Sequence, residues 1–180
     1  MAPWPQPDAL QIQAPETAVW IAPPHPFDLH EVYLNFRSPR WQWDGTGEVT
    51  LWITADSRYK LWINGRFHHR GPARSWPHAQ KMDVLDITDQ LIVGENGLAV
   101  QVYQPGYSHF SNVHRAAAGL LAWVTVDDEV VLVTNGRWRT IRDESFASDV
   151  PRISIYGSGV EQRDLNRVVD WETAVFDDSH

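Results

Sequence analysis

Alternating apolar and polar residues recur along this 180-residue chain. In the clearest example, residues 30–38, Val32, Leu34 and Phe36 fall on one face of an extended segment and polar residues fall on the other. Because successive side chains of a strand point to opposite faces, this pattern predicts a half-buried strand. Similar short runs predict further strands at 17–22, 48–55, 81–87, 98–104, 120–126, 130–134, 138–141, 153–156 and 161–165.

A hairpin is predicted at the centre of the chain. Residues 59–63 alternate in polarity up to Asn64-Gly65, and residues 66–70 continue beyond it until Gly71-Pro72. Asn-Gly suits a type I′ turn, which needs positive φ at both central residues, and Gly-Pro ends a strand.

The elements together predict an all-β fold. Residues 88–91 are expected to form one helical turn and residues 94–97 a tight turn, and no longer amphipathic helix is visible. Ten or so short strands with turn signals between them favour an antiparallel β-sandwich or barrel. Residues 1–16 are rich in proline and are expected to be irregular.

Composition narrows the classes of function. The net charge of −8 argues against a nucleic-acid partner and against an anionic membrane surface. The absence of cysteine excludes a disulfide framework, a thiol nucleophile and a Cys-ligated zinc site. The chain starts without a secretory leader and has no apolar run of the ~20 residues that span a bilayer, so the expected location is cytoplasmic.

Several segments resemble one family. They read ITADSRYKLWINGR at 53–66, RGPARSWPHAQ at 70–80, DVLDIT at 83–88, GENGLAVQVYQPGY at 94–107 and SIYGSGVEQRDL at 154–165. Together they are similar to the N-terminal β-sandwich region of bacterial α-L-rhamnosidases of glycoside hydrolase family 78. The hairpin and DVLDIT are shared by many galactose-binding-like domains. The second and last segments point more narrowly to rhamnosidases.

The resemblance implies a jelly-roll, galactose-binding-like sandwich over residues 17–165. It also implies that the parent enzyme is an inverting hydrolase whose catalytic carboxylates lie in a helical barrel that this chain lacks. Residues 166–180 end in WETAVFDDSH, which resembles a junction leading into a downstream domain. The expected role is therefore a non-catalytic accessory domain, with rhamnosylated glycans or the downstream domains of the parent enzyme as partners.

Two loops contain the candidate binding residues. Aromatic and polar side chains gather at 74–78 and at 107–115, where the candidates are Arg74, Trp76, His78, Tyr107, His109, His114 and Arg115. Aromatic rings can stack on a sugar while polar groups bond its hydroxyls, but Trp, Tyr and Arg are also the usual anchors of protein interfaces. Both interpretations stay open, and the interdomain contact is favoured.

No catalytic or metal site is predicted. Carboxylate pairs such as Asp83/Asp86 and Asp127/Asp128 fit turn and capping roles. The histidines lack a metal-binding pattern. A structural Ca²⁺ would suit a jelly-roll sugar-binding domain, although the sequence shows no dedicated loop for it.

The tryptophans are divided between core and surface. Trp20, Trp123 and Trp138 lie among apolar neighbours in predicted strands and are expected in the core. Trp52 and Trp62 point away from the apolar faces of their strands. If they pair across the hairpin, another element covers them or they form an exposed aromatic patch.

Overall fold

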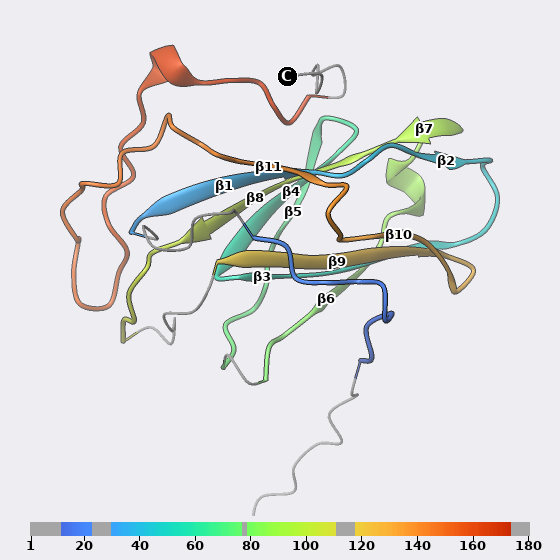
Figure 1. The fold of residues 1–180 in the computed structure, drawn as a ribbon, viewed down its shortest axis with the longest axis horizontal. Coiled ribbons are helices and arrows are strands. Elements are labelled where there is room, and N and C mark those ends of the chain that lie inside the picture. The colour runs from blue at the N-terminus through green and yellow to red at the C-terminus, as the bar shows by residue number, and fades with distance from the viewer. Residues whose placement is uncertain (1–11, 23–29, 77–78, 111–117, 174–180) are drawn as a thin grey trace, which may run out of the picture.

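Two antiparallel sheets pack face to face in the computed structural model, which describes residues 12–22, 30–76, 79–110 and 118–173 (Figure 1). The five-stranded sheet has the order β11 (Arg139–Arg142), β1 (Val32–Arg37), β8 (Leu98–Gln104), β4 (Arg58–Ile63) and β5 (Arg66–Gly71). The four-stranded sheet has the order β10 (Glu129–Val133), β9 (Gly119–Val126), β3 (Val49–Asp56) and β6 (Asp83–Asp86). The chain is thus an all-β sandwich, as predicted.

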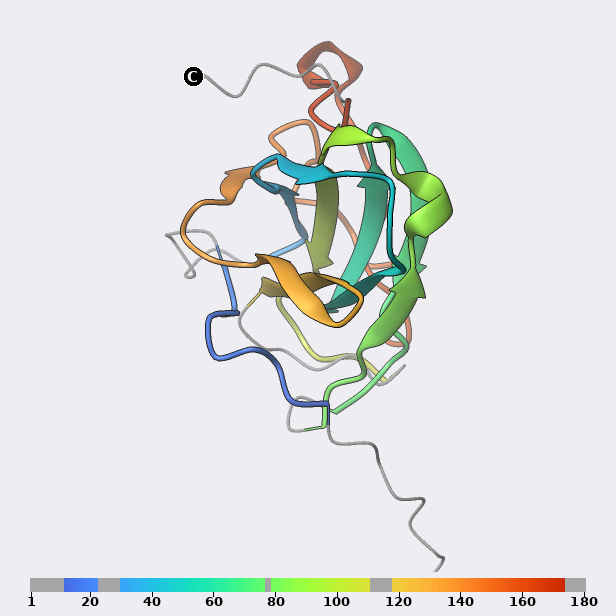
Figure 2. The same cartoon turned by 90° about the vertical axis from the view of Figure 1, so that its right-hand side faces the viewer.

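A small third sheet lies at one end of the sandwich. There β2 (Trp41–Trp43) pairs with β7 (Gly94–Asn96), and Figure 2 views the molecule from this end. Among the residues that the structure describes, the helical elements are two single 3₁₀ turns, η1 (Thr88–Gln90) and η2 (Leu165–Arg167). Within the described residues, no helix has the length and apolar character needed to cross a membrane.

The core lies between the two large sheets. The apolar faces predicted for β1, β3 and β4 point inward, where Leu34, Phe36, Leu51, Ile53 and Leu61 are at most 2% exposed. Their alternating partners point outward on both sheets. Burial of these aliphatic and aromatic side chains is the main force that holds the sheets together.

The predicted hairpin is confirmed. Strands β4 and β5 pair antiparallel around Asn64 and Gly65, whose φ angles of 50° and 81° are those a type I′ turn requires. A bulge follows Leu61 in the pairing of the two strands.

Several predicted elements differ from the structure. Residues 94–97 were expected to form a tight turn, but Gly94–Asn96 is strand β7 because β2, which the pattern did not reveal, pairs with it. Residues 17–22, 153–156 and 161–165 are not strands and make only isolated bridges or turns. Apolar alternation alone does not make a strand, because a strand also needs a partner edge.

The segment that follows β11 covers the outer face of the five-stranded sheet (orange to red in Figure 1). Phe146 stacks on Tyr33 of β1 with ring centroids 3.8 Å apart, and Trp171 meets Trp62 of β4 edge to face at 5.4 Å. This segment therefore replaces water on part of a face that alternation would assign to solvent.

The tryptophans differ in whether they lie in the core or outside the sheets. Trp52 stacks on Trp123 of β9, outside the four-stranded sheet, so Trp52 and Trp62 do not pair with each other. Trp138 is buried in the core as expected. The prediction for Trp20 is wrong, because its side chain is 46% exposed.

Candidate functional site

Polar and aromatic side chains form two rows across the outer face of the five-stranded sheet. The register places Tyr33, Tyr103 and Arg58 side by side on β1, β8 and β4. Two residues further along, the register aligns Asn35, Gln101, Lys60 and Arg70 on β1, β8, β4 and β5. Because alternate residues share a face, both rows point away from the core.

A groove of about 420 Å³ opens over these rows, and we call it the tyrosine groove. The covering segment forms one wall of it. The lining residues are Tyr33, Arg58, Tyr59, Lys60, Arg70, Gly71, Pro72, Gln101, Tyr103, Ser158, Gly159 and Glu161. Arg58 links the floor to the wall, since its guanidinium donates to Ser158 Oγ at 2.7 Å and lies over the Tyr103 ring.

Glu31 fastens this wall to the sheet. Its buried carboxylate accepts hydrogen bonds from the Tyr103 hydroxyl at 2.5 Å, from the Tyr107 hydroxyl and from the Gly159 backbone N–H at 2.8 Å. These partners come from the end of β8, from the following loop and from the covering segment. Three donors to one carboxylate compensate for the burial of its charge.

A second buried carboxylate joins the floor of the groove to the start of the covering segment. Asp143 Oδ2 accepts from Asn35 Nδ2 at 3.2 Å and from Gln101 Nε2 at 3.1 Å. Its Oδ1 accepts from the Ser145 N–H and hydroxyl. The side-chain amide of Gln101 is thereby held in one orientation, with its N–H donors used inside the protein.

The tyrosines of this region titrate at high pH. Burial, with added hydrogen bonds or repulsion from carboxylates, raises the pKa of Tyr33, Tyr59 and Tyr103 far above the ordinary 10.0, and raises that of Tyr107 to about 12. In the unfolded chain they ionise near 10. Their contribution to stability is therefore complete below that pH and is lost as the pH rises towards the folded values.

We expect the free energy of unfolding to fall steeply above about pH 10. Urea unfolding between about pH 8 and about pH 11, followed together with tyrosinate absorbance, measures it. Tyr103→Phe should make the fall shallower. Folded-state tyrosines that all titrate at the ordinary value would contradict this expectation.

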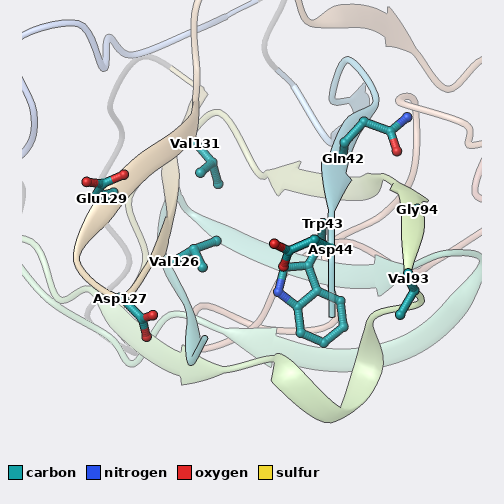
Figure 3. A pocket seen from close by; sticks show the side chains of 9 residues that line it. All are labelled: Gln42, Trp43, Asp44, Val93, Gly94, Val126, Asp127, Glu129 and Val131. Carbon is teal, nitrogen blue, oxygen red and sulfur yellow. The ribbon is translucent and has the colours of Figure 1, made fainter. Parts of the chain in front are cut away.

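A second, open hollow of about 670 Å³ lies at the β2–β7 end (Figure 3). Trp43 lies at its centre, with Val93 and Val131 on opposite sides. Its polar groups are used locally: the Trp43 indole N–H donates to the Thr46 carbonyl, and Asp44 accepts from Thr46. Asp127 Oδ1 accepts from the Glu48 N–H. These bonds stabilise turns, so we favour the tyrosine groove as the candidate site.

The predicted loop residues occupy different environments. Arg74 and Trp76 are exposed in the loop between β5 and β6. Tyr107 is bound to Glu31, and Arg152 lies over its ring at 4.1 Å. His109 is buried, and burial together with Arg58, Arg152 and Arg74 lowers its pKa. His78, His114 and Arg115 lie outside the described residues.

The sequence prediction placed the candidate residues in loops and missed most of the groove residues. The signal was present, since Tyr33, Lys60, Gln101 and Arg70 occupy the outward positions of predicted strands. The sequence did not reveal which outward face a later segment would cover. In the described part of the chain, no three histidine or carboxylate side chains gather as metal ligands.

A solved enzyme structure contains a close counterpart of this chain. The GH78 family rhamnosidase of Bacillus sp. GL1 superposes on 89% of the chain with a TM-score of 0.84 and 35% sequence identity. The chain is similar to one part of a family-78 rhamnosidase. The resemblance expected from the sequence is therefore confirmed. The match spans 17% of the Bacillus chain, so it concerns a small part of that enzyme.

More distant rhamnosidases share the fold. The α-L-rhamnosidase of Streptomyces avermitilis, solved with L-rhamnose, matches 92% of this chain and 14% of its own at 20% identity and a TM-score of 0.55. The enzyme of Aspergillus terreus matches 73% of this chain and 17% of its own at 24% identity and a TM-score of 0.58. No family model and no curated protein matches the sequence.

Proposed function

We propose that this chain is a non-catalytic accessory domain of an α-L-rhamnosidase-like glycoside hydrolase, and that it binds carbohydrate in the tyrosine groove. The similarity to 17% of the Bacillus rhamnosidase is the observation that carries the accessory role. A domain of this kind holds a rhamnosylated glycan near the catalytic part of its parent enzyme.

The chemistry of the groove supports binding rather than hydrolysis. An inverting glycosidase needs an acid and a base about 6.5–9.5 Å apart. Of the groove residues that the structure describes, only Glu161 is a carboxylic acid. Glu31 and Asp143 are buried and engaged by donors of the protein itself. What the groove offers is a dense set of hydrogen-bonding groups beside aromatic rings, which suits sugar hydroxyls.

Calorimetric titration of the chain with L-rhamnose and with rhamnosylated oligosaccharides tests this function. We expect binding with a dissociation constant of about 1 mM or lower. Glu161→Ala removes a hydrogen-bond acceptor from the groove and should weaken binding several-fold. The matched variant Glu129→Ala changes the open hollow of Figure 3 and should bind as the unaltered chain does. No heat at millimolar sugar, or turnover of an aryl α-L-rhamnoside by the chain alone, would refute the proposal.

A scaffold without sugar affinity is the second candidate. Trp76 and Phe110 are 56% and 74% exposed in loops at one end of the sandwich, and aromatic residues are typical anchors of interfaces. This function predicts no heat with any sugar, together with concentration-dependent self-association in sedimentation experiments. Trp76→Ser and Phe110→Ser should then reduce the self-association.

A further inference from the structure

We infer that the tyrosine groove selects an acidic saccharide, one whose sugar ring bears a carboxylate such as a uronate. The inference rests on the proposed function, because it names the class of carbohydrate that the same groove takes. The observation behind it is a pair of cations on the floor of the groove.

Lys60 and Arg70 lie directly opposite each other on β4 and β5. Both side chains line the groove. Two like charges at opposed positions of an antiparallel pair repel each other, so this arrangement destabilises the protein when no ligand is bound. A bound anion between the two side chains removes the repulsion.

The described part of the chain supplies no carboxylate to this pair. The ion pairs found there join other residues, and Arg70 instead lies over the Phe67 ring at 5.6 Å. Glu161, the carboxylate of the groove, interacts with the Tyr33 hydroxyl, whose pKa it helps to raise. A pair of cations without a carboxylate partner is unusual in a protein with a net charge of −8, in which acidic side chains outnumber basic ones.

The surrounding groups fit the remainder of a sugar. Gln101 neighbours Lys60 across β8 and β4, and its amide N–H groups donate to Asn35 and Asp143. Its amide oxygen is therefore oriented away from those two partners and accepts from a ligand hydroxyl. Ser158 and Glu161 stand on the wall opposite the floor. A carboxylate on Lys60 and Arg70 places the ring of the same sugar beside these acceptors.

The decisive experiment compares two disaccharides that differ at one position, where one bears a carboxylate and the other a neutral hydroxymethyl group. Rhamnosyl-galacturonate and its carboxyl-reduced counterpart, rhamnosyl-galactose, are titrated into the unaltered chain and into Lys60→Gln/Arg70→Gln. We expect the acidic disaccharide to bind at least about tenfold more tightly than the neutral one, with an advantage that declines as salt is added. The double variant should lose this advantage and bind the two alike.

Arg66→Gln is the matched control, because Arg66 lies on the same hairpin but does not line the groove. It should keep the preference. The double variant should have a thermal midpoint equal to or above that of the unaltered chain, since it removes a repulsion, and this shows that a lost preference is not a loss of folding.

Three other outcomes would contradict the inference. Equal affinity for the two disaccharides in the unaltered chain overturns the acidic preference but leaves carbohydrate binding in place. A preference that survives in the double variant overturns the assignment to Lys60 and Arg70, because another cation, such as Arg58, would then recognise the carboxylate. Binding of neither disaccharide overturns both this inference and the carbohydrate-binding part of the proposed function.

Discussion

Phe36→Ala is expected to lower the free energy of unfolding by about 3–5 kcal/mol. The Phe36 ring is fully buried near the end of β1 and belongs to the cluster of apolar side chains between the sheets. Its truncation loses the transfer free energy of the ring and leaves a cavity that the strands on either side, β11 and β8, cannot close without breaking their register. Urea unfolding measures the loss as a lower midpoint at an unchanged slope.

Ile141→Ala is the control for that experiment. Ile141 lies on the neighbouring strand β11 and is 65% exposed, so its truncation leaves no cavity. It should change the free energy of unfolding by less than about 0.5 kcal/mol. Phe36→Leu should fall between the two variants. Equal losses for Phe36→Ala and Ile141→Ala would show that the space between the sheets is not the core.

Glu31→Ala is expected to cost about 3 kcal/mol, the second largest effect. The change leaves the hydroxyls of Tyr103 and Tyr107 and the N–H of Gly159 without their acceptor. Since Gly159 belongs to the covering segment, the wall of the tyrosine groove should also loosen. Trypsin then provides a second measurement, because Arg152 lies in that segment and should become a cleavage site.

Glu31→Gln is the matched variant, since it keeps the shape of the side chain and one oxygen acceptor. It should cost less than the alanine variant and should stay resistant to trypsin. Unchanged proteolysis of Glu31→Ala would mean that other contacts, such as the stacking of Phe146 on Tyr33, hold the covering segment without Glu31.

Local signals in the sequence predicted most of the framework. Alternation identified which of Val32, Leu34 and Phe36 face inward, because a period of two assigns a face without knowledge of the partner strand. Asn64-Gly65 located the hairpin, because few other residue pairs accept positive φ at both positions. Five segments also revealed the similarity to family-78 rhamnosidases, since turns and strand ends leave recognisable residues at fixed places.

Pairing between distant segments could not be predicted in the same way. Strand β2 is only three residues long, and it exists because β7 lies beside it, more than fifty residues away. Residues 153–156 alternate as well as many strands do, yet they pair with none of the strands that the structure describes and form a turn. A strand is stabilised mainly by the strands beside it. Alternation indicates which of its side chains share a face, but it does not supply a partner strand.

The sequence by itself determined the all-β class, the inward faces of the main strands, the central hairpin and the resemblance to rhamnosidases. All of these depend on the geometry of residues close together in the chain. Only the tertiary structure decided where the groove proposed as the binding site lies. The tyrosine groove exists because the segment after β11 folds back over two rows of side chains from four different strands, and one buried carboxylate, Glu31, fastens it there. That assembly depends on contacts between residues more than a hundred positions apart, and no local pattern records them.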